Sequence, residues 1–202
     1  MTIWFASGNK NKREELSRIF NEKAQKWTII TPDDKGIKFE PVEDAGDFAG
    51  NALKKAQELY KLIKEPVIAD DSGICLDALN GRPGIFSARY GSENGKKLES
   101  HERNALLLAE LGDNPQRTAR FVCAMCLLID INRFFIVQEI LEGEIIHESR
   151  GKDGFGYDPV MYLPEYGVTV AELSAKEKNT ISHRAKAARA VLRFLENLNG
   201  SS

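Results

Sequence analysis

The chain has only three cysteines and three histidines among its 202 residues. A small, odd number of cysteines excludes a disulfide framework. No run of about 18 apolar residues occurs, which excludes an ordinary membrane-spanning helix. The first residues lack the basic segment that precedes the apolar run of a secretory signal. We therefore expect a cytoplasmic protein with no membrane partner.

The chain also lacks a large excess of either positive or negative charge. The 28 Lys and Arg residues are balanced by 30 Asp and Glu residues, for a net charge of -2. This balance does not suit a surface that coats nucleic acid, so we expect no nucleic-acid partner. The length is enough to bury a sizeable core. We expect residues 1–199 to form a single domain and residues 200–202 to form a tail.

The cysteines lie in apolar segments. Cys123 and Cys126 have C-x-x-C spacing, but they fall in a run over residues 121–129 that is typical of a buried strand. Positions three apart on a strand face opposite sides, which suits neither a zinc site nor a redox pair. We interpret these two residues, and Cys75, as core cysteines.

Apolar periodicity predicts alternating strands and helices. Helices are expected over residues 10–23, 47–64, 98–111 and 182–198, with a short capped helix after Ser174. Strands are expected over residues 2–6, 27–31, 67–69 and 74–76. Two longer segments, 118–131 and 134–147, predict a long hairpin across Asn132-Arg133, and a loop is expected from Asn80 to about Gly95. The fold class is therefore α/β, with a central mixed, twisted sheet flanked by helices.

Two adjacent carboxylates follow a short apolar run. Asp70 and Asp71 come after Pro66-Val67-Ile68 and precede Ser72-Gly73. Neighbouring side chains of a strand face opposite ways, so on a covered strand at least one carboxylate is buried. A buried carboxylate needs a cation, a metal or hydrogen bonds. The alternative is a solvated turn, since Asp, Ser and Gly are common turn residues.

The segment Ser7 to Lys12 lies between the first predicted strand and helix. Backbone N–H groups at the start of a helix bind anions, and Lys10 and Lys12 add positive charge for phosphates. The spacing of a Walker loop is absent. An ordinary Ser-Gly-Asn turn is the alternative.

Two further segments carry polar and aromatic side chains. In the stretch from Gly151 to Pro159, the glycines let the backbone approach a ligand closely, and Phe155 and Tyr157 offer aromatic faces for a planar base. Near the start of the last helix stand three hydrogen-bond donors, Lys178, His183 and Arg184. Cations are unfavourable beside the positive end of the helix dipole, so a bound anion or a ligand acceptor would explain them. The alternatives are a structural turn with two core aromatics, and a solvated helix end.

Five motifs occur together in a fixed order. They are Ser7–Lys12, Ala69–Gly73, Pro83–Tyr90, Gly154–Pro159 and Ile181–Arg184. In this combination the chain resembles the inosine triphosphate pyrophosphatase family, from about Ile3 to Leu195. The resemblance implies an α/β protein of two lobes with the site in the cleft between them, and a homodimer.

The resemblance also implies roles for individual residues. Lys12 would be the main cation for the triphosphate, and Asp71 the catalytic base beside Asp70. Glu43 and Asp71 would hold Mg²⁺, with Mn²⁺ as a possible substitute. Ser72 would contact the substrate, and Phe155 would stack on the base. The full set of expected substrate-binding residues is Ser7, Gly8, Asn9, Lys10, Asn11, Lys12, Ser72, Phe155, Gly156, Tyr157, Asp158, Lys178, His183 and Arg184.

The implied activity is Mg²⁺-dependent hydrolysis of non-standard purine nucleoside triphosphates, ITP, dITP and XTP, to the monophosphate and pyrophosphate. One departure is Gly50, which stands where many members have a glutamate. At the third position of the predicted helix, a glutamate would complete a capping box and supply a carboxylate that could lie near the metal, and glycine can do neither. Two alternatives therefore stay open: a pyrophosphatase for other modified nucleotides, or a catalytically silent nucleotide-binding module.

Overall fold

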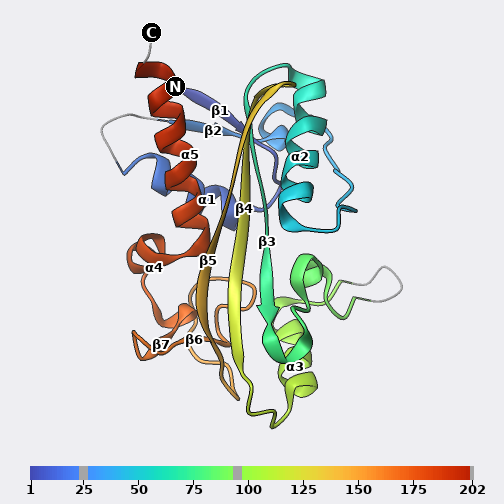
Figure 1. Ribbon diagram of the computed structural model, residues 1–202, viewed down its shortest axis with the longest axis vertical. Helices are drawn as coiled ribbons and strands as arrows, with labels where there is room; N and C mark the ends of the chain where they lie inside the picture. The colour runs from blue at the N-terminus through green and yellow to red at the C-terminus, as the bar shows by residue number, and fades with distance from the viewer. Residues whose placement is uncertain (23–26, 93–96, 201–202) are drawn as a thin grey trace. The chain divides into compact units, whose positions relative to one another are not determined.

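The computed structural model of the chain describes residues 1–22, 27–92 and 97–200. Within these residues, one sheet of seven strands has the order β2-β1-β3-β4-β5-β6-β7 (Figure 1). β1 is parallel to β2 and β3, whereas β6 is antiparallel to both β5 and β7, so the sheet is mixed as predicted. The strands are β1 (Thr2–Phe5), β2 (Thr28–Ile30), β3 (Val67–Leu76), β4 (Thr118–Asp130), β5 (Arg133–Ile145), β6 (Met161–Leu163) and β7 (Val168–Thr169).

The helices follow the predicted periodicity, with shifts at their ends. They are α1 (Lys10–Phe20), α2 (Phe48–Ile63), α3 (Ser100–Leu111), α4 (Ala175–Ile181) and α5 (His183–Gly200). α1 ends before the expected position because Asn21 caps it and donates its side-chain amide to the Ser17 carbonyl at 2.8 Å. The expected ends at Lys23 and Gly95, and the tail residues 201–202, lie outside the described residues. Gly200 is the last residue of α5.

The chain divides into two compact units, and the division falls within β3, β4 and β5. The first unit comprises Met1–Asp71, Cys123–Glu139 and His183–Ser202. In it, α1 and α5 pack together and cover one face of the sheet, while α2 covers the other (Figure 1). Apolar side chains of β1, β3 and β4, including Phe5, Ile68 and Met125, pack against α1 and α5 in a single core.

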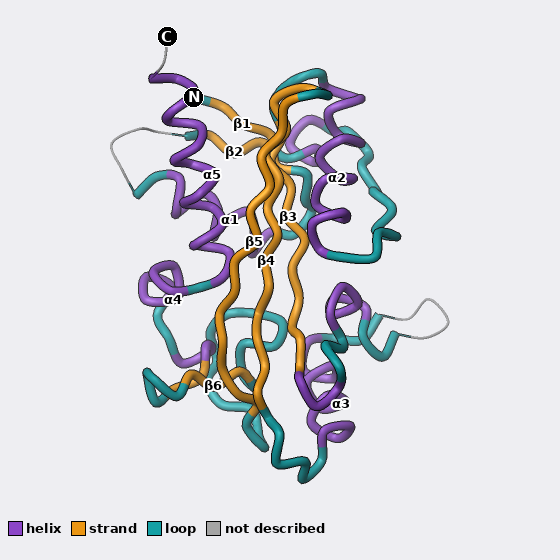
Figure 2. Tube along the Cα trace, in the orientation of Figure 1, coloured by secondary structure: helices purple, strands orange, loops and turns teal. Residues whose placement is uncertain are grey.

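The second unit comprises Ser72–Val122 and Ile140–Ser182. Its core joins the last residues of β3 to α3 and to the β5–β7 region, with Ile74, Leu107 and Met161 fully buried. The tube in Figure 2 shows β4 and β5 as two long neighbouring strands, which confirms the predicted hairpin.

Two sequence-based expectations need comment. The short strands predicted over residues 67–69 and 74–76 form one continuous strand, so the turn expected at Asp70 to Gly73 is wrong. Cys123 and Cys126 are free and fully buried in β4, as expected, whereas Cys75 is free and half-buried. Among the described residues, no helix is both long and apolar enough to span a membrane.

Candidate active site

The paired carboxylates lie on β3, just beyond the end of its parallel neighbour. β1 pairs with β3 as far as Ile68, whose carbonyl accepts from the Ala6 N–H at 2.8 Å. The carboxyl ends of parallel strands are where α/β sheets gather polar groups. Because adjacent residues of a strand face opposite ways, Asp70 points toward α1 and α5, and Asp71 points toward α2.

Asp70 is buried and holds two cations. Lys12 Nζ lies 3.2 Å from Oδ1 and 3.0 Å from Oδ2 of Asp70, and Arg184 Nε lies 3.2 Å from Oδ2. Burial alone would raise the pKa of the Asp70 carboxyl, but the charges of Lys12 and Arg184 outweigh it and hold that pKa well below its usual range. Asp70 is therefore ionised throughout the physiological range.

Arg184 also pairs with a second carboxylate. Its Nη1 lies 2.5 Å from Oε2 of Glu15, a buried residue of α1. Burial opposes the charged form, yet Asp70 and Glu15 raise the pKa of Arg184. The alternative of a solvated helix end is therefore wrong at this position, because carboxylates of the chain itself surround the guanidinium.

Asp71 has a different environment. Asn51 Nδ2 donates to its Oδ2 at 2.9 Å, and Lys55 Nζ lies 3.4 Å from its Oδ1. Burial raises the pKa of the Asp71 carboxyl, and the nearby Lys55 offsets only part of that rise. A carboxylate with a raised pKa is better suited to accept a proton than its neighbour Asp70.

Lys55 joins Asp71 to Glu43. Its ammonium lies 2.6 Å from Oε1 of Glu43, and its side chain is buried. Burial alone would lower the pKa of Lys55, but the carboxylates of Asp70 and Asp71 raise it. The lysine is therefore a fixed positive charge between two carboxylates.

Glu43 and Asp71 are the two carboxylates expected to hold the metal, and both contact the Lys55 ammonium nitrogen. A cation of the chain itself therefore lies between them, and a metal ion would take its place. Mg²⁺ is commonly held by one or two carboxylates together with substrate phosphates and water. The described residues contain no group of three or more His, Cys, Asp or Glu side chains placed to hold a metal ion.

The predicted phosphate segment forms the cap of α1. Asn9 Oδ1 accepts from the Lys12 N–H at 3.2 Å, and Ser7 Oγ accepts from the Asn9 N–H at 3.2 Å. This cap directs the Lys12 side chain to Asp70. Gly8 and Asn11 are exposed.

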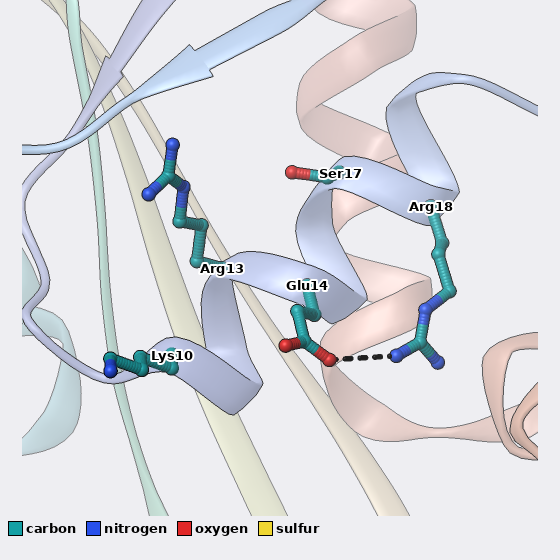
Figure 3. Close-up of a pocket in the computed structure, with 5 residues that line it drawn as sticks. All are labelled: Lys10, Arg13, Glu14, Ser17 and Arg18. Carbon is teal, nitrogen blue, oxygen red and sulfur yellow. Dashed lines mark hydrogen bonds and ion pairs between the residues drawn. The ribbon is translucent and has the colours of Figure 1, made fainter. Parts of the chain in front are cut away.

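Lys10 lies elsewhere on the same helix. It lines a pocket along α1 together with Arg13, Glu14, Ser17 and Arg18 (Figure 3). Of the two predicted phosphate lysines, only Lys12 therefore contacts the carboxylates of β3 in this structure.

The second unit holds the predicted nucleoside residues. Asp158 is buried and accepts from the Phe155 N–H at 2.8 Å and from Lys178 Nζ at 2.7 Å. The Lys178 ammonium also lies 4.6 Å from the centre of the Phe155 ring. A Cβ on Gly154 would lie 2.1 Å from Asp158 Oδ2, so this tight turn requires glycine there.

Two more bonds hold this loop. Asn104 on α3 donates its amide to the Gly156 carbonyl at 3.1 Å, and the Tyr157 hydroxyl donates to the Ser87 carbonyl at 2.9 Å. Burial raises the pKa of Tyr157 to about 12, so its hydroxyl remains neutral. Tyr157 is thus a core anchor of the loop, while Phe155 is half-buried.

The structure brings together some predicted residues and adds others. In the first unit, Lys12 and Arg184 pair with Asp70 on one face of β3, and Asp71 and Glu43 share Lys55 on the other face. In the second unit, Asp158 and Lys178 pair beside Phe155. Ser72 is half-buried and His183 is buried. Sequence reasoning did not single out Glu15, Asn51 or Lys55. The i, i+4 spacing of Asn51 and Lys55 on α2 is the signal that could have placed both on the face of that helix toward β3.

Comparison with known proteins finds a family match over most of the chain. The Ham1 family model matches residues 3–194. The dITP/XTP pyrophosphatase of Treponema denticola is 45% identical over 196 residues, covering 97% of this chain and 99% of that protein. The dITP/XTP pyrophosphatase of Geobacillus kaustophilus is also 45% identical, over 92% of this chain and 89% of that protein.

Solved structures agree as well. The Ham1 protein of Coxiella burnetii has a TM-score of 0.86 and 35% identity, and covers 98% of this chain and 99% of that one. The Ham1 protein of Staphylococcus aureus has a TM-score of 0.84, with the same identity and coverage. These matches confirm the resemblance that the five motifs suggested, and the chain belongs to the Ham1 family.

Proposed function

We propose that this protein hydrolyses non-standard purine nucleoside triphosphates, such as ITP, dITP and XTP, to the monophosphate and pyrophosphate. The observation that carries the proposal is the pair of buried carboxylates on β3, with Lys12 on one face and Lys55 on the other. The names of the similar proteins from Treponema denticola and Geobacillus kaustophilus support the choice of substrate.

The two carboxylates would have different roles. Asp70, tied to Lys12 and Arg184, fixes the position of Lys12, which would stabilise charge developing on the phosphoryl oxygens. Asp71, with its raised pKa, would position the attacking water and accept its proton. Attack at the α-phosphorus would then release pyrophosphate. No covalent nucleophile is needed.

Glu43 and Asp71 would hold the divalent cation, which we propose to be Mg²⁺, with Mn²⁺ as a substitute. When bound, this ion would neutralise the triphosphate and orient it. Lys55 contacts both carboxylates and would keep their charge balanced without the ion. Carboxylate oxygens are hard ligands, which suit Mg²⁺ better than zinc.

For the nucleoside, we propose that Phe155 stacks on the base and that Lys178 and His183 help to read it. Inosine and xanthosine carry an oxygen at the purine 6-position, where adenosine carries an amino group. A pocket lined with donors favours the 6-oxo bases, because adenine would leave a buried donor unmatched. The Arg184 guanidinium pairs with Glu15 and Asp70, two carboxylates of the chain itself, so we assign the contact with the base to Lys178 and His183.

We also propose that the protein is a homodimer and that it is located in the cytoplasm. The catalytically silent alternative is less attractive, because Glu43 supplies a carboxylate beside Asp71 although Gly50 has none. The alternative of other modified nucleotides differs only in the base.

One experiment distinguishes the proposed function from its two alternatives: measurement of pyrophosphate release from a panel of nucleoside triphosphates. ITP, dITP, XTP, GTP, ATP and modified pyrimidine nucleotides would be compared with Mg²⁺, with EDTA, and with EDTA followed by excess Mg²⁺. We expect ITP, dITP and XTP to be hydrolysed far ahead of ATP, and EDTA to abolish turnover until Mg²⁺ returns. Equal efficiency on ATP and ITP would contradict the proposed base preference, and full activity in EDTA would contradict the proposed role of the metal.

A further inference from the structure

Asn51 connects the start of α2 to the carboxylate of Asp71. It is the fourth residue of the helix and is completely buried. Its Nδ2 donates to Asp71 Oδ2 at 2.9 Å, and its Oδ1 accepts from the Ala45 N–H at 3.0 Å. A buried amide with both ends bonded to fixed partners is held in a single orientation.

The chemistry of the partners decides that orientation. The backbone N–H of Ala45 can only donate, so the atom that faces it must be the amide oxygen. The NH₂ group of Asn51 is therefore left to face Asp71. Since Lys55 lies 3.4 Å from the other oxygen of Asp71, a donor faces each oxygen of the carboxylate.

Gly50 makes the contact with Ala45 possible. A Cβ at position 50 would lie 2.9 Å from the Cβ of Ala45 and 3.3 Å from Oδ1 of Asp47, the residue that caps α2. The first of these distances is too short for two carbon atoms, so the segment that carries Ala45 would have to move. The glycine that interrupts the family motif thus allows this segment to pack closely on the first turn of α2.

We propose that Asn51 is a positioning residue for Asp71, and that Gly50 is required for it because it lets Ala45 orient the amide. The proposal rests on the proposed function insofar as Asp71 acts in hydrolysis and metal binding. Hydrogen-bond partners of metal-binding carboxylates typically contribute about 10–100-fold to activity or metal affinity. Asn51 should act on this scale.

The test compares Asn51→Ala with Asn21→Ala. Asn21 also bridges backbone groups, since its amide donates to the carbonyls of Ser17 and Trp27. It lies at the end of α1, and its hydrogen bonds to the described residues are all with backbone groups. For Asn51→Ala we expect a kcat for ITP lower by about 10–100-fold with little change in KM, and weaker binding of Mn²⁺ alone, measured by electron paramagnetic resonance without nucleotide. Asn21→Ala should lower thermal stability while keeping kcat and Mn²⁺ binding.

Gly50→Ala provides a second variant that should fold. Alanine favours a helix over glycine, so a purely structural view predicts equal or higher stability and unchanged turnover. Our proposal predicts a lower kcat and weaker Mn²⁺ binding, because Ala45 is displaced from Asn51. Stability should change little, because the higher helix propensity of alanine offsets the cost of moving Ala45, whereas turnover should fall.

The outcomes distinguish failure of the positioning role of Asn51 from failure of the proposed function. Wild-type kcat in both Asn51→Ala and Gly50→Ala, or losses no larger than that of Asn21→Ala, would overturn the positioning role while leaving the proposed function intact. If the wild-type protein releases no pyrophosphate from any triphosphate, the proposed function fails instead. The positioning role is then decided by Mn²⁺ binding: weaker binding in Asn51→Ala supports it, and unchanged binding rejects it.

Discussion

Arg184 on α5 and Asp70 on β3 form a buried ion pair across 114 positions of sequence, with Nε 3.2 Å from Oδ2. Lys12 shares the carboxylate from α1, and Glu15 shares the guanidinium. One carboxylate thus joins a strand to the two helices that cover one face of the first unit. The neighbouring Asp71 faces the other way and serves a different set of partners.

Replacing Asp70 should destabilise the protein, whereas replacing Asp71 should not. Asp70→Asn removes the carboxylate that partly buried Lys12 and buried Arg184 share, and breaking a buried ion pair typically costs about 3–5 kcal/mol. Asp71→Asn removes a carboxylate whose pKa is raised by burial, so ionised Asp71 opposes folding. Urea unfolding at pH 7 measures both. Equal stability of the two variants would contradict this distinction.

The acid dependence of stability should follow from the same ion pair. The pKa of Asp70 is lower in the folded protein than the usual value of 3.8, so its stabilising effect is complete above that pH and is lost as the pH falls below it. The free energy of unfolding should therefore decrease below about pH 4 in the wild type, and less steeply in Asp70→Asn. Urea titrations from pH 7 to pH 2.5 provide the comparison, and parallel curves would argue against the assignment.

Turnover should depend on the carboxylate of Asp71. Asp71→Asn keeps the shape of the side chain but removes its charge and most of its basicity, so we expect pyrophosphate release from ITP to fall by at least about 100-fold. Circular dichroism should show an intact fold. Near-normal turnover in the folded variant would remove Asp71 from the catalytic role.

Asp158 should control binding of the nucleoside through the loop that it holds. It accepts from the Phe155 N–H and from Lys178 Nζ, so Asp158→Asn weakens a buried ion pair and loosens the position of the Phe155 ring. We expect KM for ITP to rise more than kcat falls. Glu165→Gln, at an exposed position of the same unit, provides the control. A loss confined to kcat would show that the loop acts on catalysis instead.

The expected dimer can be tested at Phe86. This side chain is 53% exposed in a short 3₁₀ helix between β3 and α3, and we expect it to contact the partner subunit. By its family, we expect a two-fold symmetric dimer. Light scattering at micromolar concentration should give a dimer mass, and Phe86→Ser should weaken association more than Tyr166→Ser, at a residue of similar exposure. A monomer mass for the wild type would contradict the prediction.

Local patterns in the sequence predicted most of the elements. The stripe of Leu16, Ile19 and Phe20 predicted α1, Asp47 predicted the start of α2, and Ser174 with Glu177 predicted the capping box of α4. Each of these features depends on residues at most a few positions apart, so the sequence contains all the information needed. The order of five short motifs was likewise enough to indicate the family.

Longer-range features depended on the tertiary structure. The motif Asp70-Asp71-Ser72-Gly73 has the composition of a turn, but it continues β3 because the buried cations and amide around it satisfy its polar groups. Lys55 resembles any solvated helix lysine in sequence, and only the packing of α2 on β3 makes it the partner of Glu43 and Asp71.

The sequence by itself therefore determined which elements form and which chemistry the chain carries, because helix caps, apolar periodicity and short motifs are local. Only the tertiary structure decided that Asp70 pairs with Lys12 and Arg184 while Asp71 faces Asn51 and Lys55. Neighbouring strand residues face opposite sides of the sheet, and what each of them meets there depends on helices far away in the chain.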